Sequence, residues 1–134
     1  MELIKNGSFT LNNQPSLTGW DRNSSETEPK AEGFGGFPNC AYFPPKLTSQ
    51  HLHQDIVWTG SESYTLRFYA KGSAGARLNF AVGTLSDEIA VTDVWQEFVR
   101  PVNKIGNGWL HLHTINRVGS FYLTGVSLTD ELAS

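Results

Sequence analysis

The alternation of apolar and polar residues is clearest in the middle of the chain. Every second residue is apolar from Tyr64 to Ala70 and again from Leu78 to Val82. This period of two predicts strands with one buried face. Further strands are expected at 2–5, about 47–57, 89–92, 95–99, 109–115 and 121–128, and no segment shows the 3.6-residue stripe of an amphipathic helix.

Turn residues separate these strands. Glycine-containing stretches at 71–75, 83–87 and 105–108 predict turns, and Arg100-Pro101 is expected to end the strand before it. Strands that recur every 8–12 residues or so with turns between them are typical of a sandwich or a barrel.

The first third of the chain is less regular, because 12–30 is mostly polar and 33–38 fits no regular element. The glycine- and proline-rich stretch over 33–45 is either a loop that covers the sandwich or an arm that docks on a partner. Its candidate docking residues are Phe34, Phe37, Tyr42 and Phe43.

Composition supports a single all-β domain. The chain has 134 residues, about the size of one domain, with 39% hydrophobic, 12% aromatic and only 17% charged residues. A net charge of −3 offers no basic face for nucleic acid, so no nucleic-acid partner is expected. No apolar run approaches the roughly 20 residues of a membrane span, so no membrane insertion is expected.

The single cysteine, Cys40, excludes an internal disulfide. We expect Cys40 to be a small buried hydrophobe rather than a nucleophile. The N-terminal residues lack the basic and apolar regions of a signal peptide, so we expect a protein made in a cytoplasm and not exported by the usual route.

Several sequence landmarks follow one another in a known order. They are LIKNGSF at 3–9 with Gly19-Trp20, LHQDI at 52–56 with YTLRFYAK at 64–71, TDVWQEF at 92–98 and FYLTGVSL at 121–128. Together they resemble carbohydrate-binding modules of families four and nine and their jelly-roll relatives. The resemblance covers nearly the whole chain and implies a single jelly-roll β-sandwich of two antiparallel sheets over residues 1–134.

Two strands carry histidines on one side. His51 and His53 alternate with Leu52 and Gln54, and the stretch LHLH at 110–113 alternates leucine with histidine. If the leucines pack inward, the histidines point outward. The resemblance implies that these two strands are antiparallel neighbours. The candidates for a binding face are therefore Trp109, His111, His113, His51, His53, Arg77 and Asn79, with Trp58 at a strand end.

Four interpretations of this face remain open. Imidazoles two residues apart on neighbouring strands are able to hold a metal, but only Asp55 adds a carboxylate, and no metal is expected. Trp109 and the histidines also suit a carbohydrate groove or a protein interface. The simplest alternative is a solvated sheet face. Trp20 and Trp95 lie at landmarks of the resemblance and are expected in the core, whereas Trp58 either lines a binding rim or covers the core edge.

A structural calcium is implied by the resemblance but poorly supported here. The related modules often carry one acid just after the opening Phe and another in the closing strand. This chain has Thr10 and Thr124 at those positions. Calcium prefers several oxygen ligands that include carboxylates, so we expect no cofactor and regard calcium as doubtful.

Catalysis has little support in the sequence. Glycosidases need two carboxylates that flank the bond, and the nearest pairs, Asp87-Glu88 and Asp93 with Glu97, lie beside expected turns or at a strand edge. No nucleophile-elbow pattern and no phosphate-binding glycine loop is present. We therefore expect no enzyme.

Two functions compete. A jelly roll made in a host cytoplasm suits a structural protein of a phage-like virion, by analogy with decoration, cement and tail-associated proteins. It would bind virion proteins or copies of itself through exposed aromatic residues. The alternative is a lectin-like module that binds a polysaccharide through Trp109 and the histidine pairs.

Overall fold

The computed structural model describes residues 2–22, 27–44, 51–104, 108–114 and 120–130. This part of the chain is built from antiparallel strands and contains no helix. The strands are β1 (Thr10–Leu11), β2 (Gln14–Pro15), β3 (Asp21–Arg22), β4 (Glu28–Lys30), β5 (Cys40–Phe43), β6 (His51–Asp55), β7 (Ser63–Gly72), β8 (Arg77–Val82), β9 (Leu85–Ala90), β10 (Gln96–Asn103), β11 (Trp109–Thr114) and β12 (Phe121–Asp130).

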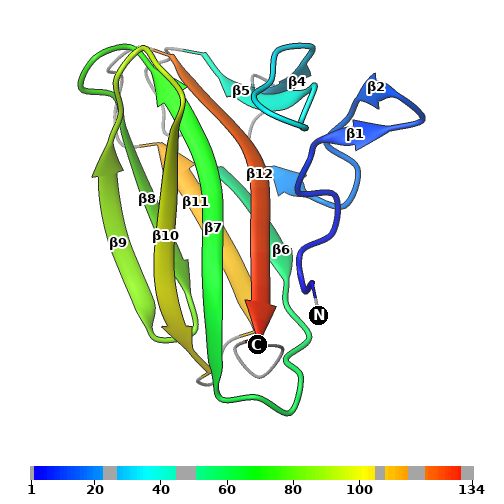
Figure 1. The fold of residues 1–134 in the computed structure, drawn as a ribbon, viewed down its shortest axis with the longest axis vertical. Coiled ribbons are helices and arrows are strands. Elements are labelled where there is room, and N and C mark those ends of the chain that lie inside the picture. The colour runs from blue at the N-terminus through cyan, green and yellow to red at the C-terminus, as the bar shows by residue number, and fades with distance from the viewer. Residues whose placement is uncertain (1, 23–26, 45–50, 105–107, 115–119, 131–134) are drawn as a thin grey trace.

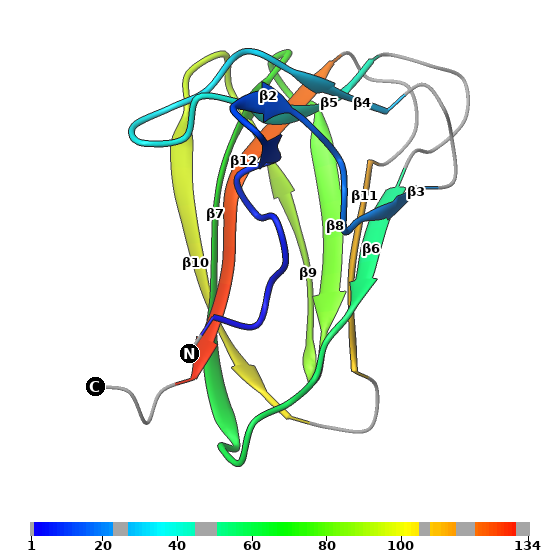
Figure 2. The same ribbon diagram turned by 90° about the vertical axis from the view of Figure 1, so that its right-hand side faces the viewer.

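Two five-stranded sheets face each other (Figures 1 and 2). The first sheet has the order β10-β7-β12-β5-β4, and the second sheet has the order β3-β6-β11-β8-β9. A separate hairpin joins β1 to β2. Figure 2 shows the two layers edge-on, with β4, β5 and the β1–β2 hairpin at one end of the sandwich. The expected jelly-roll β-sandwich is confirmed.

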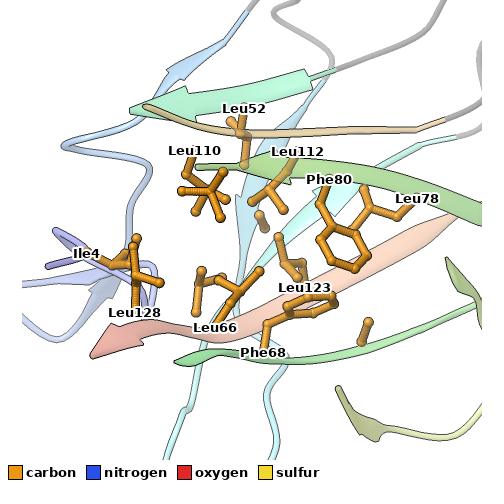
Figure 3. Packing of buried hydrophobic residues seen from close by; sticks show 14 of the residues in the cluster. Ile4, Leu52, Leu66, Phe68, Leu78, Phe80, Leu110, Leu112, Leu123 and Leu128 are labelled. Carbon is orange, nitrogen blue, oxygen red and sulfur yellow. The ribbon is translucent and has the colours of Figure 1, made fainter. Parts of the chain in front are cut away.

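The core lies between the sheets and follows the period of two. Leu66 and Phe68 of β7 point inward from the first sheet, and Phe80 of β8 and Leu112 of β11 meet them from the second (Figure 3). Phe68 packs edge-on against Phe80, with ring centroids 5.2 Å apart. Both sheets contribute buried leucine and aromatic side chains to one hydrophobic layer. The packing of this layer fixes how the two sheets are placed relative to each other.

Two strand boundaries differ from the sequence expectation. The turn predicted over 83–87 is shorter, because β9 already begins at Leu85 and Gly83 adopts a left-handed φ of 57°. The strand predicted to end at Arg100-Pro101 continues to Asn103. Pro101 is tolerated because β10 is the edge strand of its sheet and pairs only with β7 there.

The N-terminal residues do not form the strand expected at 2–5. Glu2 makes one isolated bridge to Thr129 of β12, and the following residues contact β12 only through single backbone hydrogen bonds at Leu3 and Gly7 rather than as a paired strand. The polar stretch after residue 12 instead contains the short strands β2, β3 and β4. Part of the strand expected over 47–57 lies outside the described residues, as does most of the turn at 105–108.

Of the two tryptophans expected in the core, one lies there and the other does not. Trp20 is buried and stacks on Phe9 with ring centroids 5.3 Å apart, as expected for a core residue. Trp95 was expected in the core, but it is only half-buried and packs against Phe34 and Lys71 on the outside of the first sheet. No helix in the described ranges is long and apolar enough to cross a membrane.

Candidate functional site

The histidines form one cluster on the outer face of the second sheet. In the β6–β11 register, His53 lies opposite His111 and His51 opposite His113. The alternating leucines of both strands are fully buried, so the histidine sides point outward. The expected adjacency of these strands and the expected orientation of their faces are both confirmed.

The four imidazoles are close enough to interact. Ring centroids lie 4.8 Å apart for His51 and His111, 5.2 Å for His111 and His113, and 6.1 Å for His53 and His111. Trp109 continues the row along β11, with its ring 6.5 Å from that of His53. We call these five residues the His/Trp platform.

Polar neighbours border the platform on both sides. Asn79 Nδ2 on β8 lies 3.3 Å from His113 Nε2, and Asp21 Oδ2 on β3 lies 3.7 Å from His53 Nε2. Arg77 at the start of β8 forms an ion pair with Glu88 of β9. The candidates Arg77 and Asn79 therefore lie on the same sheet face as the histidines.

Three histidines of the platform favour the neutral form. Burial lowers the pKa of His51, His111 and His113, and the neighbouring imidazoles lower the pKa of His51 and His111 further. A neutral imidazole offers one donor and one acceptor, which suits a hydroxyl group. Nε2 of His111 is buried and has no hydrogen-bond partner among the described residues.

Acidification is expected to destabilise the fold. The unfolded chain takes up protons first as the pH falls below the ordinary histidine pKa of 6.5, so the free energy of unfolding should decrease from there downward. Urea unfolding at a series of pH values from neutral to mildly acidic measures this slope. A His111→Gln, His113→Gln double variant should show a shallower slope, and Phe34→Ala should not. An unchanged slope in the double variant would contradict the assignment.

Two hollows lie beside the platform, and both are over β8. One, of about 330 Å³, is lined by residues of β8, β9 and β11, including Ala81, Ser86 and His111. The other, of about 110 Å³, is lined by Ala81, Trp109 and His111 among others. Trp109 is 51% exposed, so its indole is open to solvent. The face therefore combines an open aromatic ring, neutral hydrogen-bonding side chains and a depression between strands.

Trp58 does not join the platform. It packs partly buried against the core, with its ring centroid 5.0 Å from that of Tyr64. Of the two positions considered for Trp58, the structure places it at the core edge.

The candidate docking residues are divided by the structure. Phe43 is fully buried in the core, because it faces inward from β5 rather than lying in a loop. Phe34 and Phe37 pack against Tyr69 on the outside of the first sheet, although Phe34 stays 42% exposed. Tyr42 lies on the same face and packs against Tyr122. The described part of this glycine- and proline-rich stretch therefore packs against the sandwich of its own domain.

The aromatic rings on the outside of the first sheet already have cationic partners. Lys30 Nζ lies 4.5 Å from the ring centroid of Tyr42, and Lys71 Nζ lies 5.3 Å from that of Trp95. A hollow of about 330 Å³ on this side is lined partly by Glu2, Tyr69 and Arg67. The Glu2 carboxylate accepts hydrogen bonds from Leu128 N at 2.8 Å and from Ser127 Oγ. Side chains on this face are therefore engaged with one another.

Residues at the positions implied for calcium form a neutral network. Asn39 Nδ2 donates to Thr10 Oγ1 at 2.8 Å, and Thr124 Oγ1 donates to the Asn39 carbonyl at 2.6 Å. Thr124 is fully buried and Asn39 is 4% exposed. The three side chains carry no carboxylate, and the Asn39 amide faces Thr10 with its N–H group rather than its oxygen. This donor set does not fit calcium.

Metal and thiol chemistry have no support within the described ranges. No three His, Cys, Asp or Glu side chains there are grouped so that they could hold a metal ion. Cys40 is fully buried, and burial raises the pKa of its thiol to about 12. The thiol is therefore protonated at neutral pH, as expected of a small buried hydrophobe.

Sequence reasoning missed the side of the hollow formed by β9. Ser86 pairs with Ala81, and Glu88 with Asn79, across the β8–β9 ladder. The signal was weak because 83–87 was expected to be a turn. The period of two already placed Ala81 on the same face as Arg77 and Asn79. Alanine has no polar group, however, so nothing in the sequence marked Ala81 as part of a site.

Comparison with known proteins identifies the fold. No family model matches the chain, and no curated protein matches it in sequence. The solved structure of the carbohydrate-binding module TmCBM61 in complex with beta-1,4-galactotriose is similar, with a TM-score of 0.77 and 16% identity over 98% of this chain and 99% of that one. A family 4 carbohydrate-binding module is similar with a TM-score of 0.65 and 16% identity over 96% of this chain and 99% of that one.

A phage protein is also similar. It is the enzymatically active domain of tailspike protein 4 of bacteriophage CBA120, with a TM-score of 0.71 and 14% identity. The match covers 96% of this chain but 21% of the tailspike chain. At these identities the comparisons establish the fold, which is the jelly roll of carbohydrate-binding modules.

Proposed function

We propose that this domain is a non-catalytic carbohydrate-binding module that binds a polysaccharide on the outer face of the second sheet. The observation that carries the proposal is the part of the His/Trp platform that borders the hollows, namely Trp109, His111 and His113. An open indole packs against the apolar face of a sugar ring, and neutral imidazoles match the donors and acceptors of its hydroxyl groups. The similar structures support the proposal, since TmCBM61 was solved with a galactotriose.

The proposal is tested by binding to a panel of soluble polysaccharides that includes β-1,4-galactan, xylan and bacterial surface polysaccharides. Saturable binding to at least one is expected. Trp109→Ala should weaken that binding by about tenfold or more, because aromatic anchors at the centre of a contact contribute most of its energy. The side chain is half exposed, so the variant should stay folded.

Phe34→Ala is the matched control. Phe34 is another exposed aromatic residue, but it lies on the outside of the opposite sheet against Tyr69. Its replacement should leave polysaccharide binding unchanged. Equal losses in both variants, or no saturable binding to any polysaccharide in the panel, would count against the proposal.

A virion role is the second candidate, and the tailspike similarity is the observation that favours it. We propose that, in this case, the module would serve attachment on a tail appendage rather than hold a capsid lattice. The expected ligand would then be a bacterial surface polysaccharide. A preference for plant polysaccharides in the same panel would count against this candidate. Localisation in a virion and self-association stay predictions.

A further inference from the structure

We infer that the bound glycan lies along β8, in a groove between β11 and β9, and that Ala81 determines whether it fits. This inference rests on the proposed function and narrows it from a whole sheet face to one groove and one direction. The two hollows share Ala81 and His111 in their linings. They therefore adjoin each other at Ala81 and His111.

The pairing of strands explains why the depression is there. Ala81 lies opposite His111 of β11 and opposite Ser86 of β9, so a one-carbon side chain stands between a large residue and a small polar one. In the neighbouring row, Asn79 lies between His113 and Glu88. One side of the groove carries imidazole and indole, the other side carries hydroxyl and carboxylate, and the floor consists of the Ala81 methyl group and the Asn79 amide.

The direction follows from which strands line the hollows. Their lining comes from β8, β9, β11 and Gly83, and no described residue of β3 or β6 contributes to it. A ligand lying across the strands would pass over His51 and His53, where neither hollow extends. Along β8, the span from Asn79 to Gly83 is about 13 Å at the usual rise per residue, which suits a short linear oligosaccharide.

The inference assigns different roles to the two histidine pairs. His111 and His113 line the larger hollow and would contact the glycan. His51 and His53 lie beside them on the neighbouring strand β6, outside the two hollows. They would affect binding only through His111 and His113. Ala81 is a specificity-determining residue, because any longer side chain there would fill the floor of the groove.

The test compares variants within one sheet face, using the polysaccharide from the panel that binds most tightly. Ala81→Leu should lower affinity by about tenfold or more, and Ala81→Gly should not, since only the larger side chain fills the groove. His51→Ala should change affinity by less than about threefold, a level typical of near-neutral contacts. Thermal unfolding of each variant establishes that it is folded.

Amide chemical shifts give a second readout. Shifts on titration should be centred on Arg77–Val82, Leu85–Ala90 and Trp109–Thr114. Loss of binding in His51→Ala equal to that in Ala81→Leu, or shifts centred on His51–Asp55, would overturn the groove along β8 while leaving glycan binding in place. Absence of binding in the parent chain would instead overturn the proposed function.

Discussion

Replacing Phe68 with alanine is expected to lower the free energy of unfolding by about 3–5 kcal/mol, the usual cost of deleting a buried aromatic side chain. Phe68 is fully buried and packs against Phe80 of the opposite sheet at 5.2 Å and against Phe98 of β10 at 5.4 Å. The variant leaves a cavity between the layers that neither ring can close without moving its strand. Urea unfolding monitored by tryptophan fluorescence measures the change.

Val99→Ala is the control for this measurement. Val99 lies on β10 next to Phe98 in sequence, but its side chain is 40% exposed on the outer side of the strand. Its truncation should change stability by no more than about 0.5 kcal/mol. A loss below about 1.5 kcal/mol for Phe68→Ala would show that the two sheets do not depend on this contact.

Replacing Gly7 with alanine is expected to detach the N-terminal segment from β12. A methyl group at this position would lie 1.9 Å from the carbonyl oxygen of Val126, which is backbone and has no freedom to turn aside. The approach is close because Val126 N donates to the Gly7 carbonyl at 3.0 Å. Leu3 and Phe9 are buried on the same segment, so a loss of about 3 kcal/mol or more is expected.

Gly36→Ala provides the matched comparison. Among the described residues, and apart from Gly36 and its two chain neighbours, no atom lies within 4 Å of a methyl group at Gly36. This substitution should leave the midpoint of thermal unfolding nearly unchanged, whereas Gly7→Ala should lower it clearly. Similar midpoints for the two variants would mean that the contact with Val126 is not tight in solution.

The sequence predicted the strand faces well, because burial follows a local period of two. His51 and His53 alternate with buried residues, and so do His111 and His113, which is enough to place them on one side of each strand. The adjacency of the two strands came from the family resemblance, since no local pattern determines which strands pair.

The shape of the site was not predictable from local patterns. The groove depends on Ala81 lying between His111 and Ser86, and these contacts join residues that are far apart in the chain. Phe43 was misplaced for a related reason: glycine and proline around it suggested a loop, whereas pairing with Phe121 of β12 makes it part of a central layer.

The Thr10–Asn39–Thr124 network determines how the fold depends on its surroundings. When an ion binds only the folded state, the free energy of unfolding rises with the concentration of free ion. The size of this effect depends on the ratio of that concentration to Kd. Here the bonds run from Asn39 to Thr10 and from Thr124 to the Asn39 carbonyl, all within one covalent chain. Nothing in the network dissociates into bulk solvent, so we expect this junction to have no mass-action dependence on calcium. The N-terminal segment should then be held equally well in a calcium-rich medium and in one depleted of divalent ions.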